Sequence, residues 1–159
     1  MMSKSGKKPV VDTLDVEAKI GTDYPVQFAE KCANREKKML GDLFDLSQFG
    51  VNLTTLPPGQ WSALRHWHRE EDEFIYVVSG ELVMIDDDGE HILKAGMCAG
   101  FPAGVQNGHH VVNNSDQPAS FIEIGTRSAT EHAEYPDEDL IADKDENGFR
   151  FSNRKGESY

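Results

Sequence analysis

Two histidines separated by one residue are the first chemically informative feature of the sequence. His66 and His68 flank Trp67. Alternate residues of a strand point to the same face, so a strand here would present two imidazoles side by side. Glu73 opens the run EFIYVVS, which we expect to fold back and bring a carboxylate to the histidines. Imidazole and carboxylate ligands suit Zn, Mn, Fe, Ni or Cu, so these residues predict a site for one divalent metal ion.

A further ligand is expected from the adjacent pair His109 and His110, which begin the run HHVVNN. Neighbouring residues of a strand face opposite ways, so at most one of these imidazoles can reach the same cavity. Strand alternation places His109, Val111 and Asn113 on one face. By itself it leaves the choice between the two histidines open.

The elements around these residues are predicted to be short strands. From Gly50 to Thr126, apolar and β-branched runs alternate with turns rich in Gly, Pro and Asp, and no run shows a convincing helical period. Many short strands at roughly 8–12-residue spacing are typical of an antiparallel sandwich or barrel. The runs are VNLTTL, SALRHWH, EFIYVVS, ELVMID, HILKAG, MCAGF, HHVVNN and SFIEIG.

Two segments resemble the paired motifs of the cupin superfamily, and together they cover about half of the chain. GQWSALRHWHREEDEFIYVVSG is similar to the first motif and GMCAGFPAGVQNGHHVVN to the second. The resemblance implies an all-β, antiparallel double-stranded β-helix (a cupin or jelly-roll barrel), one metal ion in the barrel and a homodimer. The tail also resembles that of small single-domain bacterial cupins. The matching positions are His66, His68, Glu73, Gly80, Gly96, Pro102 and Gly104.

The second motif departs from the family pattern by two extra residues between Gly104 and the histidine. Counting back from Asn113 selects His109 as the metal ligand, whereas counting forward from Gly104 lands on Asn107. The resemblance therefore implies a ligand set of His66, His68, Glu73 and His109, with His110 as the alternative fourth ligand.

Four segments are expected along the chain. Residues 1–8 are polar and basic and are predicted to be a disordered N-terminus, and residues 9–48 an irregular arm with a short helix or strand near Lys38 to Leu43. Residues 49–127 form the predicted cupin barrel. Residues 128–159 are predicted to be an irregular acidic arm in which GFRFS could form one edge strand.

Charge and composition exclude several classes of function. The formal net charge is −12, with no basic face to displace counterions from phosphates, so no nucleic-acid partner is expected. An acidic surface disfavours anionic membranes, and no apolar run approaches the ~20 residues that span a bilayer. Two cysteines do not make a disulfide framework. The sequence therefore predicts a soluble cytoplasmic protein with a small-molecule partner.

Other polar or reactive residues have plainer interpretations. The acidic residues 70–72 are read as a solvated turn, with Glu71 as a fallback ligand, and Cys98 as a buried apolar filler. Asn107 is either a ligand-binding residue or part of a turn. His91 and His132 are expected at the surface. The aromatic residues expected in the core or the pocket wall are Trp61, Trp67, Phe74, Tyr76 and Phe101.

Three histidines and one carboxylate leave positions open on a five- or six-coordinate ion, which is the mark of a catalytic site. We therefore expect a metal-dependent enzyme for a small oxygen-rich molecule, of dioxygenase, isomerase, lyase or decarboxylase type. One alternative is a non-catalytic module that binds or senses a small ligand with the same metal site. Another is a metal that only ties strands together. Ligand types alone identify neither the metal nor the substrate.

Overall fold

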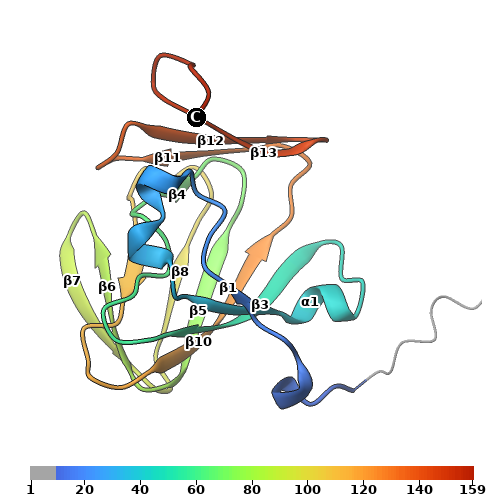
Figure 1. Ribbon diagram of the computed structural model, residues 1–159, viewed down its shortest axis with the longest axis vertical. Helices are drawn as coiled ribbons and strands as arrows, with labels where there is room; N and C mark the ends of the chain where they lie inside the picture. The colour runs from blue at the N-terminus through green and yellow to red at the C-terminus, as the bar shows by residue number, and fades with distance from the viewer. Residues whose placement is uncertain (1–9) are drawn as a thin grey trace, which may run out of the picture.

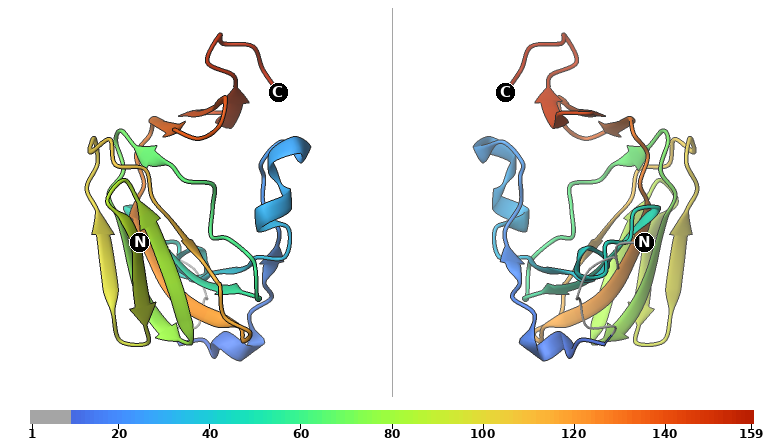
Figure 2. Two further views of the ribbon diagram at one scale, coloured as in Figure 1. Left: turned by 90° about the vertical axis from the view of Figure 1, so that its left-hand side faces the viewer. Right: turned by 90° about the vertical axis from the view of Figure 1, so that its right-hand side faces the viewer.

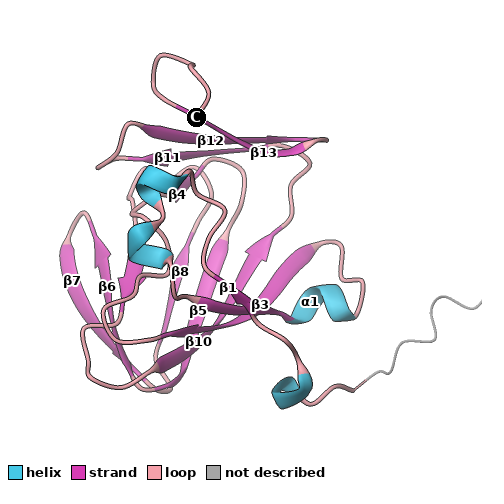
Figure 3. Ribbon diagram, in the orientation of Figure 1, coloured by secondary structure: helices cyan, strands magenta, loops and turns pink. Residues whose placement is uncertain are grey.

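The computed structural model describes residues 10–159, which form antiparallel strands with only a few short helical turns (Figure 3). This confirms the predicted all-β class. The strands make three sheets, and strands far apart in the sequence pair with one another (Figure 1). The predicted disordered N-terminus, residues 1–8, lies outside the described residues. No helix in the described part of the chain is long and apolar enough to cross a membrane.

The largest sheet has six strands in the order β1-β2-β3-β10-β5-β8. Its registers place Gly50, Gly125 and Glu73 in one cross-strand row, and Asn52, Glu123 and Ile75 in the next. Side chains of alternate residues share a face, so both rows face the interior. The strands are Lys19–Ile20 (β1), Glu36–Met39 (β2), Phe49–Leu56 (β3), Ala119–Thr126 (β10), Glu73–Ser79 (β5) and Cys98–Phe101 (β8).

A three-stranded sheet, in the order β7-β6-β9, covers one end of this interior. Its strands are Glu81–Asp86 (β6), Gly89–Lys94 (β7) and His110–Val112 (β9). Gly80 joins β5 to β6 with φ of 77°, a conformation that favours glycine. The two sheets enclose one apolar core, whose buried members are Leu56, Ile75, Val77, Leu82, Met84, Leu93, Val111, Ala119 and Phe121.

The C-terminal residues are more regular than the sequence suggested. The predicted edge strand is present as β13 (Gly148–Ser152), but β11 (Glu131–Tyr135) and β12 (Leu140–Asp145) precede it. These three strands and β4 (Trp67–His68) form a four-stranded sheet in the order β13-β12-β11-β4. Every second residue of β11 is buried, although the acidic composition of this segment gave no sign of a buried face. The C-terminal sheet therefore lies directly on the strand that carries His68 (Figure 1).

The N-terminal arm packs against this C-terminal sheet (Figure 2). Tyr24 makes edge-to-face contacts with Tyr135 and Phe151. The predicted element near Lys38 is both a strand and a helix, because β2 is followed at once by α1 (Leu40–Leu43). The remaining elements are the short turns η1 (Thr13–Asp15), η2 (Val26–Phe28) and η3 (Glu30–Cys32).

Candidate metal centre

Backbone pairing brings the two histidine motifs together. His66 and His109 form an isolated antiparallel bridge, in which the His109 amide donates to the His66 carbonyl at 2.8 Å and the His66 amide donates back at 3.2 Å. His68 follows in β4, two residues further along the same extended segment. Glu73 is the first residue of β5. The return of the chain through the 69–72 turn thus places its carboxylate opposite the histidines, as the sequence analysis expected.

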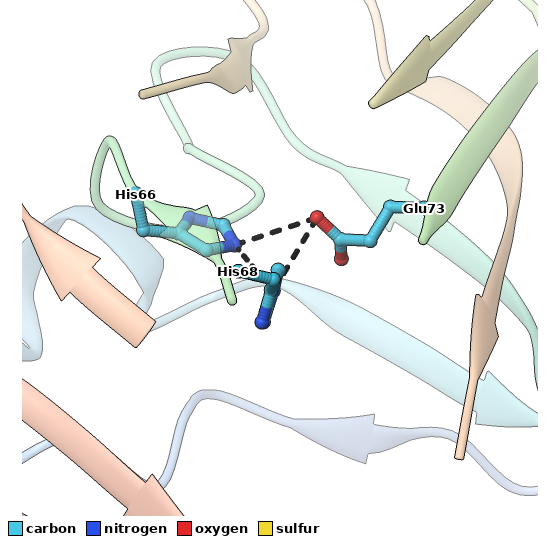
Figure 4. Close-up of side chains that lie close together, drawn as sticks. All are labelled: His66, His68 and Glu73. Carbon is cyan, nitrogen blue, oxygen red and sulfur yellow. Dashed lines mark hydrogen bonds and ion pairs between the residues drawn. The ribbon is translucent and has the colours of Figure 1, made fainter. Parts of the chain in front are cut away.

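The donor atoms of these side chains converge on one small volume. His66 Nε2 lies 3.1 Å from His68 Nε2. Glu73 Oε2 lies 3.6 Å from His66 Nε2 and 3.4 Å from His68 Nε2 (Figure 4). His109 Nε2 lies 2.8 Å from the same oxygen. His66, His68 and Glu73 form a group that could hold a metal ion, and His109 adjoins it through Glu73.

The separations of 3.1 Å between His66 and His68 and of 3.4 Å between His68 and Glu73 suit ligands of one ion. Zinc-type ions bind imidazole nitrogen at about 2.0–2.1 Å and carboxylate oxygen at about 2.0–2.2 Å, so two ligands of one ion lie roughly 3.0–3.4 Å apart. His66 Nδ1 lies 2.7 Å from the Leu64 carbonyl oxygen, to which it can only donate. That tautomer leaves Nε2 with a free lone pair directed at the cluster, the usual arrangement of a metal-bound histidine.

Ionic contacts within the cluster shift the pKa values of its members. Burial alone would raise the pKa of Glu73, but contacts with the imidazoles of His109, His66 and His68 lower it well below its usual value. Burial alone would lower the pKa of His68, but Glu131 and Glu73 raise it to about 10. Burial lowers the pKa of His66. A metal ion would displace the proton of His68, since a histidine ligand must be neutral.

The two adjacent histidines are placed in different environments. His109 reaches Glu73, and its ring stacks on Phe101 with centroids 3.5 Å apart. The ring of His110 packs edge-on against Trp61, and its Nδ1 lies 3.0 Å from the Ala63 carbonyl oxygen. Both side chains are buried. Of the pair, His109 is the one that the structure brings to the cluster.

Glu131 was not anticipated from the sequence. It lies in β11, it is 3% exposed, and its Oε1 is 3.7 Å from His68 Nδ1, which has no hydrogen-bond partner among the described residues. Its carboxylate accepts hydrogen bonds from the amides of Arg69, Glu70 and His132. A carboxylate beside the outer nitrogen of a histidine ligand orients that ring. No local pattern distinguishes this glutamate from the other acidic residues of its segment.

The cluster opens into a cavity of about 400 Å³ on the inner face of the six-stranded sheet. His66, Glu73 and His109 line one part of it, and Lys37, Glu123 and Arg127 line another. Pockets for small molecules occupy about 300–1,000 Å³, so this one suits a small ligand. Phe101 also lines the wall, as the sequence analysis allowed.

Side-chain contacts bear on two open assignments. The side chain of Asn107 is bound to the β6–β7 hairpin, because its Oδ1 accepts from the Asp87 amide at 2.9 Å and its Nδ2 donates to Asp86. Glu71 belongs to no solvated turn, because it accepts hydrogen bonds from Lys144 and the Ser128 amide, and its side chain is 13% exposed. Glu73 is the carboxylate that faces both His66 and His109. Glu71 lies with His68 and Glu131 in a second group that could hold a metal ion, so its role as fallback ligand stays a prediction.

Three expectations about burial were wrong. Cys98 is exposed and does not fill the core, because the register of β8 turns Ala99 and Phe101 inward. Tyr76 is 44% exposed on β5, whereas Phe74, although 40% exposed, lines the cavity wall as expected. Trp67 is buried as expected. His91 is exposed as expected, whereas His132 is partly buried and lies 2.7 Å from Asp143 Oδ1.

Comparisons with known proteins identify the relatives of this chain. Residues 52–125 match the family model of the cupin domain. The crystal structure of a protein from Silicibacter pomeroyi, named a sugar phosphate isomerase from a cupin superfamily, is 46% identical, with 95% of this chain and 96% of that chain covered and a TM-score of 0.91. The chain belongs to the cupin superfamily. Among curated proteins, no relative of this cupin was found.

Two further solved structures resemble this cupin. A protein from Acidithiobacillus ferrooxidans, for which a sugar phosphate isomerase activity is suggested, is 25% identical over 77% of this chain and 78% of that chain, with a TM-score of 0.72. The polyketide cyclase RemF from Streptomyces resistomycificus is 21% identical, with coverage of 79% and 80% and a TM-score of 0.60. The second likeness shows the fold alone.

Proposed function

We propose that this cupin is a metal-dependent isomerase that acts on a small sugar phosphate. The observation that carries the proposal is a cluster of imidazole and carboxylate donors that opens into a cavity also lined by Lys37 and Arg127. Among the reaction types that such a site can support, the 46% identity to the Silicibacter pomeroyi protein over 95% of the chain favours isomerisation.

The chemistry divides between the two parts of the cavity. We propose His66, His68, Glu73 and His109 as the residues that hold the ion. When bound, a divalent ion supplies Lewis-acid polarisation of a sugar carbonyl or hydroxyl oxygen. Arg127 lines the other part of the cavity beside Gly50 and supplies a guanidinium group that suits a phosphate; in the structure it forms an ion pair with Asp42. The apolar wall at Phe101 limits water around the sugar.

The test is an isomerase assay on protein purified without a metal-affinity tag, with the bound metal measured by elemental analysis. We would strip the metal with a chelator, reload Zn, Mn, Fe, Ni or Cu separately, and follow aldose and ketose phosphates by NMR. Turnover should disappear on stripping and return with at least one ion. His66→Ala should abolish metal retention and turnover, whereas His91→Ala, a matched change at an exposed histidine, should alter neither.

Metal-loaded protein that converts no sugar phosphate in the panel would overturn this proposal. Ligand-dependent stabilisation without product would instead indicate the binding or sensing alternative. Oxygen consumption with an oxygen-rich acid would indicate the dioxygenase alternative.

A further inference from the structure

A second polar cluster lies inside the barrel, apart from the metal centre. Glu123 Oε1 accepts hydrogen bonds from Thr54 Oγ1 at 3.0 Å and Asn52 Nδ2 at 3.2 Å, and lies 2.5 Å from Lys37 Nζ. These residues come from the neighbouring strands β2, β3 and β10. Lys37, Asn52 and Glu123 all line the cavity. The same cavity is therefore lined by this polar cluster and by imidazole and carboxylate groups of the candidate metal centre.

The register places Glu123 close to Glu73. Glu73 pairs directly with Gly125, so Glu123, two residues before Gly125, is its diagonal neighbour on the same face. Diagonal neighbours in a sheet lie about 7–8 Å apart, and both carboxylates line the same cavity. Gly125 and its partner Gly50 contribute no side chain to this space.

The carboxylates of Glu73 and Glu123 differ in their hydrogen-bond and ion-pair partners. Oε2 of Glu73 contacts three imidazoles. Glu123 uses one oxygen for all three of its contacts, and no donor from residues 10–159 reaches its Oε2. The side chain is 23% exposed, at the cavity. Glu123 thus has a fixed carboxylate with one oxygen left for a ligand.

Packing does not account for this ion pair. The side chains of Lys37 and Glu123 are each 23% exposed, so both reach the cavity and neither fills the apolar core. The next inward-facing residues of the same sheet, Phe121 and Val77, show that apolar side chains suit this interior. A charged cluster beside these apolar residues is better explained by a ligand that binds to it in the cavity.

We propose that Glu123, and not Glu73, is the general base of the isomerisation; this inference rests on the proposed function. Glu123 Oε2 takes the proton from the hydroxyl-bearing carbon next to the carbonyl, and the electrons of that C–H bond form the C=C bond of an enediol. The carbonyl oxygen takes a proton from water as its double bond opens. Glu123 then returns its proton to the former carbonyl carbon, and the other hydroxyl gives its proton back to water, which completes a redox-neutral exchange of aldose and ketose. Lys37, Asn52 and Thr54 hold the carboxylate in place.

The experiment compares Glu123→Gln, which keeps the size of the side chain, with wild type and with Glu90→Gln at an exposed position of β7. We expect kcat to fall by about 10²–10⁴-fold in Glu123→Gln, the range for loss of a general base, with KM, melting temperature and metal content close to wild type. Glu90→Gln should match wild type throughout. Glu123→Asp retains the charge but withdraws the carboxylate, and should also lower kcat.

The outcomes separate this inference from the proposed function. Wild-type turnover together with unchanged kcat in Glu123→Gln or Glu123→Asp would overturn the role of Glu123 and leave the isomerase proposal intact. Absence of sugar phosphate turnover in metal-loaded wild type would overturn both. If Glu123→Gln lost its metal along with its turnover, Glu123 would support the metal centre and the assignment as base would be wrong.

Discussion

The two ends of the barrel interior use the same strands for different purposes. On β10, Ala119 and Phe121 are 0% and 1% exposed in the apolar core, and Phe121 also borders the cavity that Glu123 and Gly125 line. On β5, Val77 lies in the core and Glu73 in the donor cluster. On the inward face of β10, the residue two positions after the buried Phe121 is Glu123, a polar residue of the cavity. The packed end fixes the strand positions from which the polar end projects its side chains.

The largest effect is expected at the packed end. Phe121→Ala removes a buried aromatic ring and leaves a cavity, so it should lower the free energy of unfolding by about 3–5 kcal/mol. Urea denaturation monitored by fluorescence measures this loss. Phe149→Ala, at a ring that is 52% exposed on β13, is the matched control and should cost much less. Similar losses in both variants would mean that the packed end does not dominate stability.

A smaller effect is expected from Glu131, whose carboxylate lies beside the outer nitrogen of His68. Glu131→Gln weakens the support of His68 and should reduce metal affinity by about 10–100-fold, the usual consequence of altering such an outer contact. Competition with a chromophoric chelator measures the affinity directly. Glu134→Gln, on the same strand with its side chain 32% exposed, should bind metal as wild type does. Unchanged affinity in Glu131→Gln would show that the contact with His68 has no influence on the metal.

The smallest effect is expected from a methyl group at the polar end. A Cβ at Gly125 would lie 3.5 Å from the Asp72 oxygen and 3.9 Å from Glu73 Cγ, both ordinary contacts. Gly125→Ala should therefore change the free energy of unfolding by less than about 0.5 kcal/mol. Gly80→Ala, near the packed end, should destabilise more, because φ is 77° and the new Cβ would lie 2.8 Å from the Ala119 Cβ. Equal thermal melts of the two variants would contradict this difference between the ends.

The strands of the barrel could be predicted from the sequence, whereas the residues that surround the candidate metal centre could not. β5 and β6 carry strong β-branched patterns bounded by turns, so their positions were predictable, and so was the convergence of His66, His68 and Glu73 from strand alternation. Glu123 lies between Ile122 and Ile124, so apolar residues occupy the outer face and conceal which side is the interior.

Long-range partners were not predictable. Glu131 meets the Arg69 amide across 62 residues, and a contact of that separation depends on sheet pairing that no local pattern reveals. The choice of His109 over His110 needed the register of Asn113 in the family motif. In the structure, the bridge between His66 and His109 sets which ring reaches Glu73.

Glu131 is the last residue of the candidate site to be synthesised. Ribosomes synthesise the chain from its N-terminus, so His66, His68, Glu73 and His109 all leave the ribosome before Glu131. A nascent chain that ends before β11 carries every candidate donor but lacks the carboxylate that holds the amides of Arg69 and Glu70. The candidate metal centre is therefore complete only once β11 pairs with β4.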